Sequence, residues 1–164
     1  MNSESHRIAN QIRQALTGDP WHGSPLRDLL EGVTAEQAFA WPVAAAHTIW
    51  ELVLHLDAWV NAAFDAIAGV PMPKLVGTPG DWPVATDDSP EAWGAAVDRL
   101  FQNGERFAVG IEQLDDARLR EIVPGRQYDF YHLGHGIVQH FAYHGGQIGL
   151  LRKALFADST DIKD

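Results

Sequence analysis

Apolar side chains recur at steps of three and four residues through four long segments of the 164-residue chain. This spacing gathers them on one face of an α-helix, whereas a half-buried strand would alternate apolar and polar residues. The sequence contains no pair of alternating segments around a tight-turn signal, and no internal repeat. The pattern therefore predicts an all-α protein.

The four long helices are expected at residues 3–16, 45–68, 89 to about 111, and 129–156, with short helical turns at 26–31, 34–40 and 115–122. Breaks are expected in the third long helix at Gly94, Gly104 or Gly110, because glycine weakens a helix. Four long amphipathic helices with one long connection favour a helical bundle. The length suits a single domain over residues 1–164.

The longest predicted connection, residues 70–89, is rich in Pro, Gly and Asp. A connection of this length without regular structure often marks a functional or mobile loop. Trp82 is the residue that we expect to anchor this segment to the bundle.

The charge balance restricts the classes of partner. The chain has 22 acidic and 12 basic residues, for a net charge of −10. This excess of acid argues against nucleic acid and against anionic membrane surfaces, which both attract Lys and Arg. No apolar run approaches the ~18 residues of a membrane span, and the N-terminal residues do not resemble a signal peptide. We therefore expect a cytoplasmic protein without a nucleic-acid or membrane partner.

The chain has eight histidines and no cysteine, so a metal site or nucleophile cannot use a thiolate of its own. His140 and His144 lie one helical turn apart, about 40° around the axis, where two imidazoles can chelate one ion. The glutamate that a zincin has after its first histidine is missing, since Phe141 stands there. The helical pair therefore needs further ligands to form a metal site.

His55 lies on the apolar stripe of the second long helix, as the late pair lies on the stripe of the fourth. Three inward histidines with one open position are typical of a catalytic metal site. The alternative is that these histidines are hydrogen-bonded core residues, since a buried unpaired imidazole nitrogen is costly.

The roles of the other polar residues are less constrained. On a continuous helix His47 would lie about 12 Å from His55 along the axis, so we expect it near the mouth of the bundle, as a candidate for contact with substrate. Glu51 either orients an imidazole or acts as a charge at the helix start. His132 and His135 are expected to be solvated or packed against loops.

Three runs of the sequence resemble the DinB/YfiT-like family. They are LLEGVTAEQA at residues 29–38, HTIWELVLHLDAW at residues 47–59 and HFAYHGGQIGLLR at residues 140–152. These runs match a family entry motif, a histidine motif on the second helix and a late motif with two histidines and GQI. The resemblance covers essentially the whole chain.

The resemblance implies a four-helix bundle in up-down-down-up order, with a long crossover between the second and third helices. It also implies a homodimer and a divalent metal, nickel or zinc, whose ligands fall on His55, His140 and His144. Characterised relatives are S-transferases and isomerases that depend on low-molecular-weight thiols such as bacillithiol or mycothiol, and many members have no known activity.

These observations lead to the hypothesis of a metal-dependent enzyme that acts on a small molecule. It would be either a thiol-dependent S-transferase acting on electrophiles or a hydrolase, because the nucleophile must come from a thiol cofactor or from water. Arg126, Arg152 and Lys153 are candidates for binding a thiol's carboxylates. The alternatives are a non-catalytic stress-response dimer that binds a metal or small ligand, and a structural dimer. No catalytic residue beyond the metal ligands is assigned.

Overall fold

The computed structural model describes residues 3–156, and its regular elements over that range are all helices. Their bounds are α1 Glu4–Thr17, α2 Leu26–Leu30, α3 Ala35–Phe39, α4 Ile49–Ile67, α5 Pro90–Glu112, α6 Asp116–Leu119 and α7 Phe130–Phe156. Within this range the only β pairing is an isolated antiparallel bridge between Ile122 and Asp129. The prediction of an all-α fold is confirmed, while the predicted domain of residues 1–164 extends beyond the described range.

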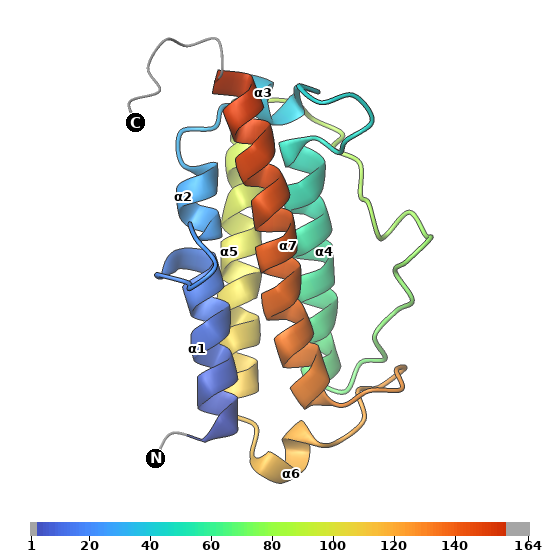
Figure 1. The fold of residues 1–164 in the computed structure, drawn as a ribbon. Coiled ribbons are helices and arrows are strands. Elements are labelled where there is room, and N and C mark those ends of the chain that lie inside the picture. The colour runs from blue at the N-terminus through green and yellow to red at the C-terminus, as the bar shows by residue number, and fades with distance from the viewer. Residues whose placement is uncertain (1–2, 157–164) are drawn as a thin grey trace.

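The long helices α1, α4, α5 and α7 pack side by side, with each helix touching two others, so that they enclose a common core. In Figure 1 the chain ascends through α1, descends through α4 and again through α5, and ascends through α7. Two consecutive descending helices require a connection that returns along the whole bundle. Residues 68–89, called the crossover below, make this return along the outside of α4 (Figure 1).

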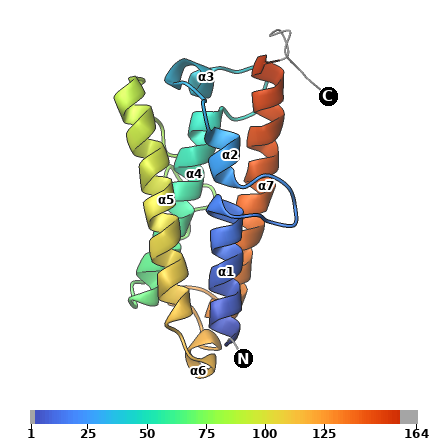
Figure 2. The ribbon, with the colours of Figure 1, turned by 90° about the vertical axis from the view of Figure 1, so that its left-hand side faces the viewer.

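One corner of the bundle is built from two pieces. Figure 2 shows α1 beside the lower half of α7, with the short helix α2 continuing above α1. Both α1 and α2 contact α7. The two helices together therefore support α7 on this side of the bundle.

Side-chain caps fix where the helices that carry the histidines begin. Thr48 and Glu51 form a capping box at the start of α4, so α4 begins at Ile49 and the predicted start near Ala45 is wrong. Ala45 has a φ of 63°, which is incompatible with a right-handed helix. At the start of α7, the Asp129 carboxylate accepts from the His132 backbone N–H at 2.8 Å, as expected for a cap.

Helix α5 is continuous from Pro90 to Glu112, so the breaks expected at its glycines do not occur. At Gly104 the reason is close packing, since an added Cβ would lie 2.6 Å from the Cδ1 atom of Leu16 on α1. The glycine therefore allows two helices to approach each other, which compensates for its low helix propensity.

The core is made of the apolar faces of the long helices, and Phe107, Phe130 and Phe141 are among the largest fully buried side chains. Burial of such faces is the main stabilising contribution in a bundle of this size. Across residues 3–156, none of the helices is both long enough and apolar enough to cross a membrane.

A second close approach gives a testable consequence. Gly134 on α7 faces Ile8 on α1, and an added Cβ would lie 2.7 Å from the Cγ2 atom of Ile8. We expect Gly134→Val to lower the free energy of unfolding by about 1–3 kcal/mol, because it overpacks this contact. The control Gly136→Ala adds a Cβ with nothing within 4 Å and should raise stability by up to about 1 kcal/mol. Urea unfolding of both variants would measure the difference, and equal stabilities would contradict the prediction.

Candidate metal centre

Three histidines from two helices meet inside the bundle. His55 on α4 and His140 and His144 on α7 each offer a ligand nitrogen, and these nitrogens all lie within 4.8 Å of one another. The Nε2 atoms of His55 and His140 are 2.9 Å apart. The side chains of His55 and His144 are buried, whereas His140 is only half-buried. The structure thus brings together the three residues that the sequence pattern and the resemblance singled out.

The spacing of these nitrogens fits a single ion. Zinc binds imidazole nitrogen at about 2.1 Å, which places tetrahedral ligands about 3.4 Å apart. The nitrogens of the three histidines lie within 4.8 Å of one another, and the 2.9 Å between the Nε2 atoms of His55 and His140 is close to this separation. The three histidines could therefore hold one divalent ion and leave a fourth position open.

In two of the imidazoles the Nδ1 atom, which is not the one facing the other histidines, donates a hydrogen bond to an oxygen. The Nδ1–H of His55 donates to the backbone carbonyl of Asp81 at 2.5 Å. The Nδ1–H of His144 donates to Oε1 of Gln147, also at 2.5 Å. An acceptor at Nδ1 selects the tautomer whose Nε2 lone pair is free, which is the usual arrangement around a metal-binding histidine.

Asp81 is delivered by the crossover and makes two further contacts at the site. Its carboxylate Oδ1 accepts from the indole N–H of Trp59 at 2.9 Å and lies 3.4 Å from Nδ1 of His55. Sequence reasoning missed Asp81, because nothing in the local pattern distinguishes it from the other acids of this segment. The only available signal was its position next to Trp82, the expected anchor.

Trp82 confirms that expectation by inserting its ring between two histidines. Its indole stacks on His55 with ring centroids 3.9 Å apart and planes 12° from parallel. On its other face it stacks on His47, with centroids 3.5 Å apart and planes 6° from parallel. The crossover therefore covers His55 with the Trp82 ring, and this ring separates His55 from His47.

Burial keeps the three imidazoles uncharged near neutral pH. It lowers the pKa of His140 to about 3, with a further contribution from repulsion by protonated His144 and His55. Burial also lowers the pKa of His55 and the pKa of His144, against opposing hydrogen bonds from Asp81 and Gln147. Neutral imidazole is the form that binds metal ions.

His47 and Glu51 lie beside the three-histidine cluster rather than in it. His47 precedes α4, so the helical geometry used to place it does not apply, but it is exposed near the end of the bundle. Glu51 is the charge at the helix start, since its carboxylate accepts from the Thr48 backbone N–H at 2.8 Å. The same carboxylate lies 3.3 Å from Nδ1 of His47.

The remaining histidines stay outside the site. His132 is exposed and packs against Tyr128, with ring centroids 5.0 Å apart. His135 packs against Tyr131 at 4.6 Å, and its Nε2 is the one buried side-chain nitrogen or oxygen without a hydrogen-bond partner among the described residues. The expectation is confirmed for His132, which is exposed and packs on a residue of the loop before α7, whereas His135 packs on a residue of α7 itself.

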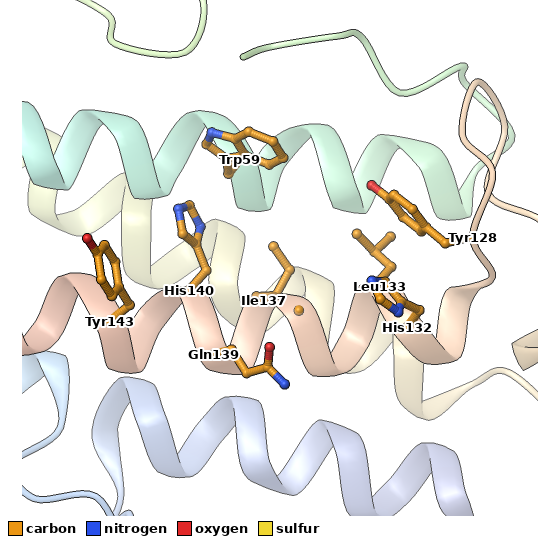
Figure 3. Close-up of a pocket in the computed structure, with 9 residues that line it drawn as sticks. Trp59, Tyr128, His132, Leu133, Ile137, Gln139, His140 and Tyr143 are labelled. Atoms are coloured by element: carbon orange, nitrogen blue, oxygen red, sulfur yellow. The ribbon is translucent and has the colours of Figure 1, made fainter.

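An apolar groove of about 520 Å³ runs along α7 from the site. Figure 3 shows Trp59 on α4 and His140 on α7 facing each other at one part of this groove, with Tyr128 towards its far end. The basic candidates do not line it: the Arg126 guanidinium donates to the Pro73 carbonyl and the Arg152 guanidinium to the Asp28 carbonyl. Lys153 lines a separate hollow on α7.

Comparison with known proteins agrees with this architecture. No curated protein and no solved structure matches the chain at a significant level. The sequence model of the DinB superfamily matches residues 21–148, which is well over half of the chain and includes all three converging histidines. The chain belongs to the DinB superfamily.

Proposed function

We propose that this protein is a metal-dependent enzyme for a small-molecule substrate, with a divalent ion, nickel or zinc, bound by His55, His140 and His144. The observation that carries the proposal is the convergence of three ligand nitrogens within 4.8 Å of one another. Nitrogen-only donor sets suit zinc, nickel, copper and iron better than magnesium or calcium. A homodimer and a single domain over residues 1–164 belong to the same proposal.

The chain's own residues prepare the site for such an ion. The Asp81 carbonyl and the Gln147 side chain hold two imidazoles with Nε2 free, and the Trp82 ring excludes water from one face of His55. Access remains from the side of His140, which is half-buried and lines the apolar groove. A divalent ion with an open position would act as a Lewis acid and lower the pKa of water or of a thiol that reaches it.

Because the chain has no cysteine, the nucleophile in hydrolysis or in thiol transfer would be water or a thiol from outside the chain. Low-molecular-weight thiols of the bacillithiol or mycothiol kind would need a basic contact for any carboxylate that they carry. No Lys or Arg lines the groove beside His140, which favours hydrolysis over thiol transfer. A non-catalytic protein that binds metal is the competing function, and turnover distinguishes the two.

Metal analysis of the purified, untagged protein tests the proposal. We expect about one ion per chain in the wild type and a loss of that ion in His55→Ala, His140→Ala and His144→Ala. The control is His132→Ala, which removes an exposed imidazole from the same helix and should keep the ion. Circular dichroism would establish that each variant is folded. A wild-type protein that holds no ion, even after nickel or zinc is supplied, would contradict the proposed function.

Activity assays then separate the chemistries. The metal-loaded protein would be incubated with uncharged aryl esters and, separately, with an aryl electrophile with and without a thiol. Ester cleavage that His140→Ala abolishes would support the hydrolase, and turnover only in the presence of thiol would support the S-transferase. Stoichiometric metal without turnover in either assay would favour a binding protein.

A further inference from the structure

The lining of the apolar groove next to His140 contains no Asp, Glu, Lys or Arg. The groove holds about 520 Å³ and its lining residues are Trp59, Tyr128, His132, Leu133, Gly136, Ile137, Gln139, His140 and Tyr143. Volumes of about 300–1,000 Å³ are usual for small-molecule sites. The chain has a net charge of −10, so a groove of this size without a single Asp, Glu, Lys or Arg differs from the rest of the protein and favours ligands without charge.

The polar atoms of two groove walls are already engaged. Trp59 donates its indole N–H to Asp81 at 2.9 Å, so it can offer a ligand only the surface of its ring. The Tyr128 hydroxyl donates to the Sδ atom of Met72 at 3.7 Å. The Trp59 ring meets the imidazole of His140 edge to face, with centroids 5.5 Å apart and planes at 72°. The aromatic wall is therefore continuous with the three-histidine cluster.

We propose that this groove binds an uncharged small molecule with a flat aromatic ring, placed so that its polar group reaches the His140 end. The inference rests on the proposed function, because it names the substrate class of that same site. An aromatic ring gains contact with Trp59 and Tyr128, whereas a carboxylate or phosphate finds no Lys or Arg in the groove. The next two hollows include none of the three histidines.

Two glycines of α7 provide a matched pair of variants. Gly136 lines the groove, and an added Cβ there meets nothing within 4 Å, so the side chain of a leucine can start without a clash and would extend into the groove. Gly146 has the same open surroundings but lines a different hollow. Gly136→Leu and Gly146→Leu thus make the same substitution on the same helix, with the same gain in helix propensity.

The test is calorimetric titration with two naphthalene probes, 2-naphthylmethanol and 2-naphthoate, which differ in charge. We expect the purified protein to bind 2-naphthylmethanol, and Gly136→Leu to weaken this binding at least tenfold while Gly146→Leu changes it less than twofold. After removal of metal, the neutral probe should still bind at least tenfold more tightly than 2-naphthoate. Metal removal prevents the ion from attracting the carboxylate.

Other outcomes would overturn the inference. Tighter binding of 2-naphthoate to the metal-free protein would reveal an anion site, and equal effects of the two leucine variants would place the probe elsewhere. Loss of a dimer in Gly136→Leu, measured by sedimentation, would show that a second copy of the chain covers the groove. A metal-loaded protein that binds no probe overturns this inference alone, whereas a protein that binds the probe but takes up no nickel or zinc when they are supplied overturns the proposed function.

Discussion

Addition of zinc or nickel to the metal-free protein is expected to raise its free energy of unfolding by about 4 kcal/mol when the free ion reaches a thousand times its dissociation constant. The folded chain gathers His55, His140 and His144, and the unfolded chain does not. Binding to the folded state alone shifts the unfolding equilibrium by mass action. Urea unfolding with and without a chelator would measure the effect, and the His144→Ala variant should lose it.

Gln147→Leu provides a finer version of this test. Gln147 is not a ligand, but its Oε1 accepts from Nδ1 of His144 at 2.5 Å and so fixes the orientation of that imidazole. Loss of such a partner typically weakens metal affinity tenfold to a hundredfold, so the stabilisation by the ion should be smaller by about 1–3 kcal/mol. The same rise in wild type, Gln147→Leu and His144→Ala would mean that the ion binds elsewhere.

Acid is expected to destabilise the metal-free protein between about pH 6.5 and pH 3. A histidine in the unfolded chain has a pKa of about 6.5, whereas burial lowers the pKa of His140 to about 3. Above this window the imidazole is neutral in both states. Within it the unfolded chain takes up a proton that folded His140 does not, so stability falls as the pH falls. At pH 4.5 this difference in proton uptake at His140 should lower the free energy of unfolding by about 2 kcal/mol, after allowance for the partial exposure of the side chain.

The variant His140→Gln isolates this contribution. Glutamine keeps a polar side chain at the rim of the groove but cannot take up a proton in this range. Urea unfolding at pH 7 and pH 4.5 measures how much the free energy of unfolding falls with acid. This fall should be smaller in the variant than in the wild type by about 2 kcal/mol. The subtraction also removes acid effects shared by both proteins, such as protonation of Glu112, whose pKa is lowered by Arg13. Identical losses would contradict the prediction.

The parts of the structure that follow local rules were predictable from the sequence. The long helix α7 and the inward positions of His140 and His144 follow from one periodic stripe, because a helix fixes which residues share a face. His55 was placed on the same basis in α4. That the two faces meet follows from the packing of α4 against α7, which the bundle class implied.

The errors and omissions lie where nonlocal or capping interactions determine the local structure. The predicted start of the second long helix was wrong because the Thr48–Glu51 capping box outweighs the good helix formers Ala44 to Ala46. Asp81 was missed because its role depends on a backbone carbonyl, which any residue could supply, and on the path of the crossover. The break expected at Gly104 does not occur, because Leu16 of α1 packs closely against this glycine.

The separation of the site residues along the chain bears on when the site can form during synthesis. The contact between His55 and His140 spans 85 positions, and the one between His55 and Asp81 spans 26. On the ribosome the crossover can therefore cover His55 long before α7 has emerged. The buried face of α4 must wait for α7, so under the proposed function an ion could be held by all three histidines only after α7 has emerged. Chains that stall before α7 would present a single imidazole under an indole, which is too few ligands to retain a metal.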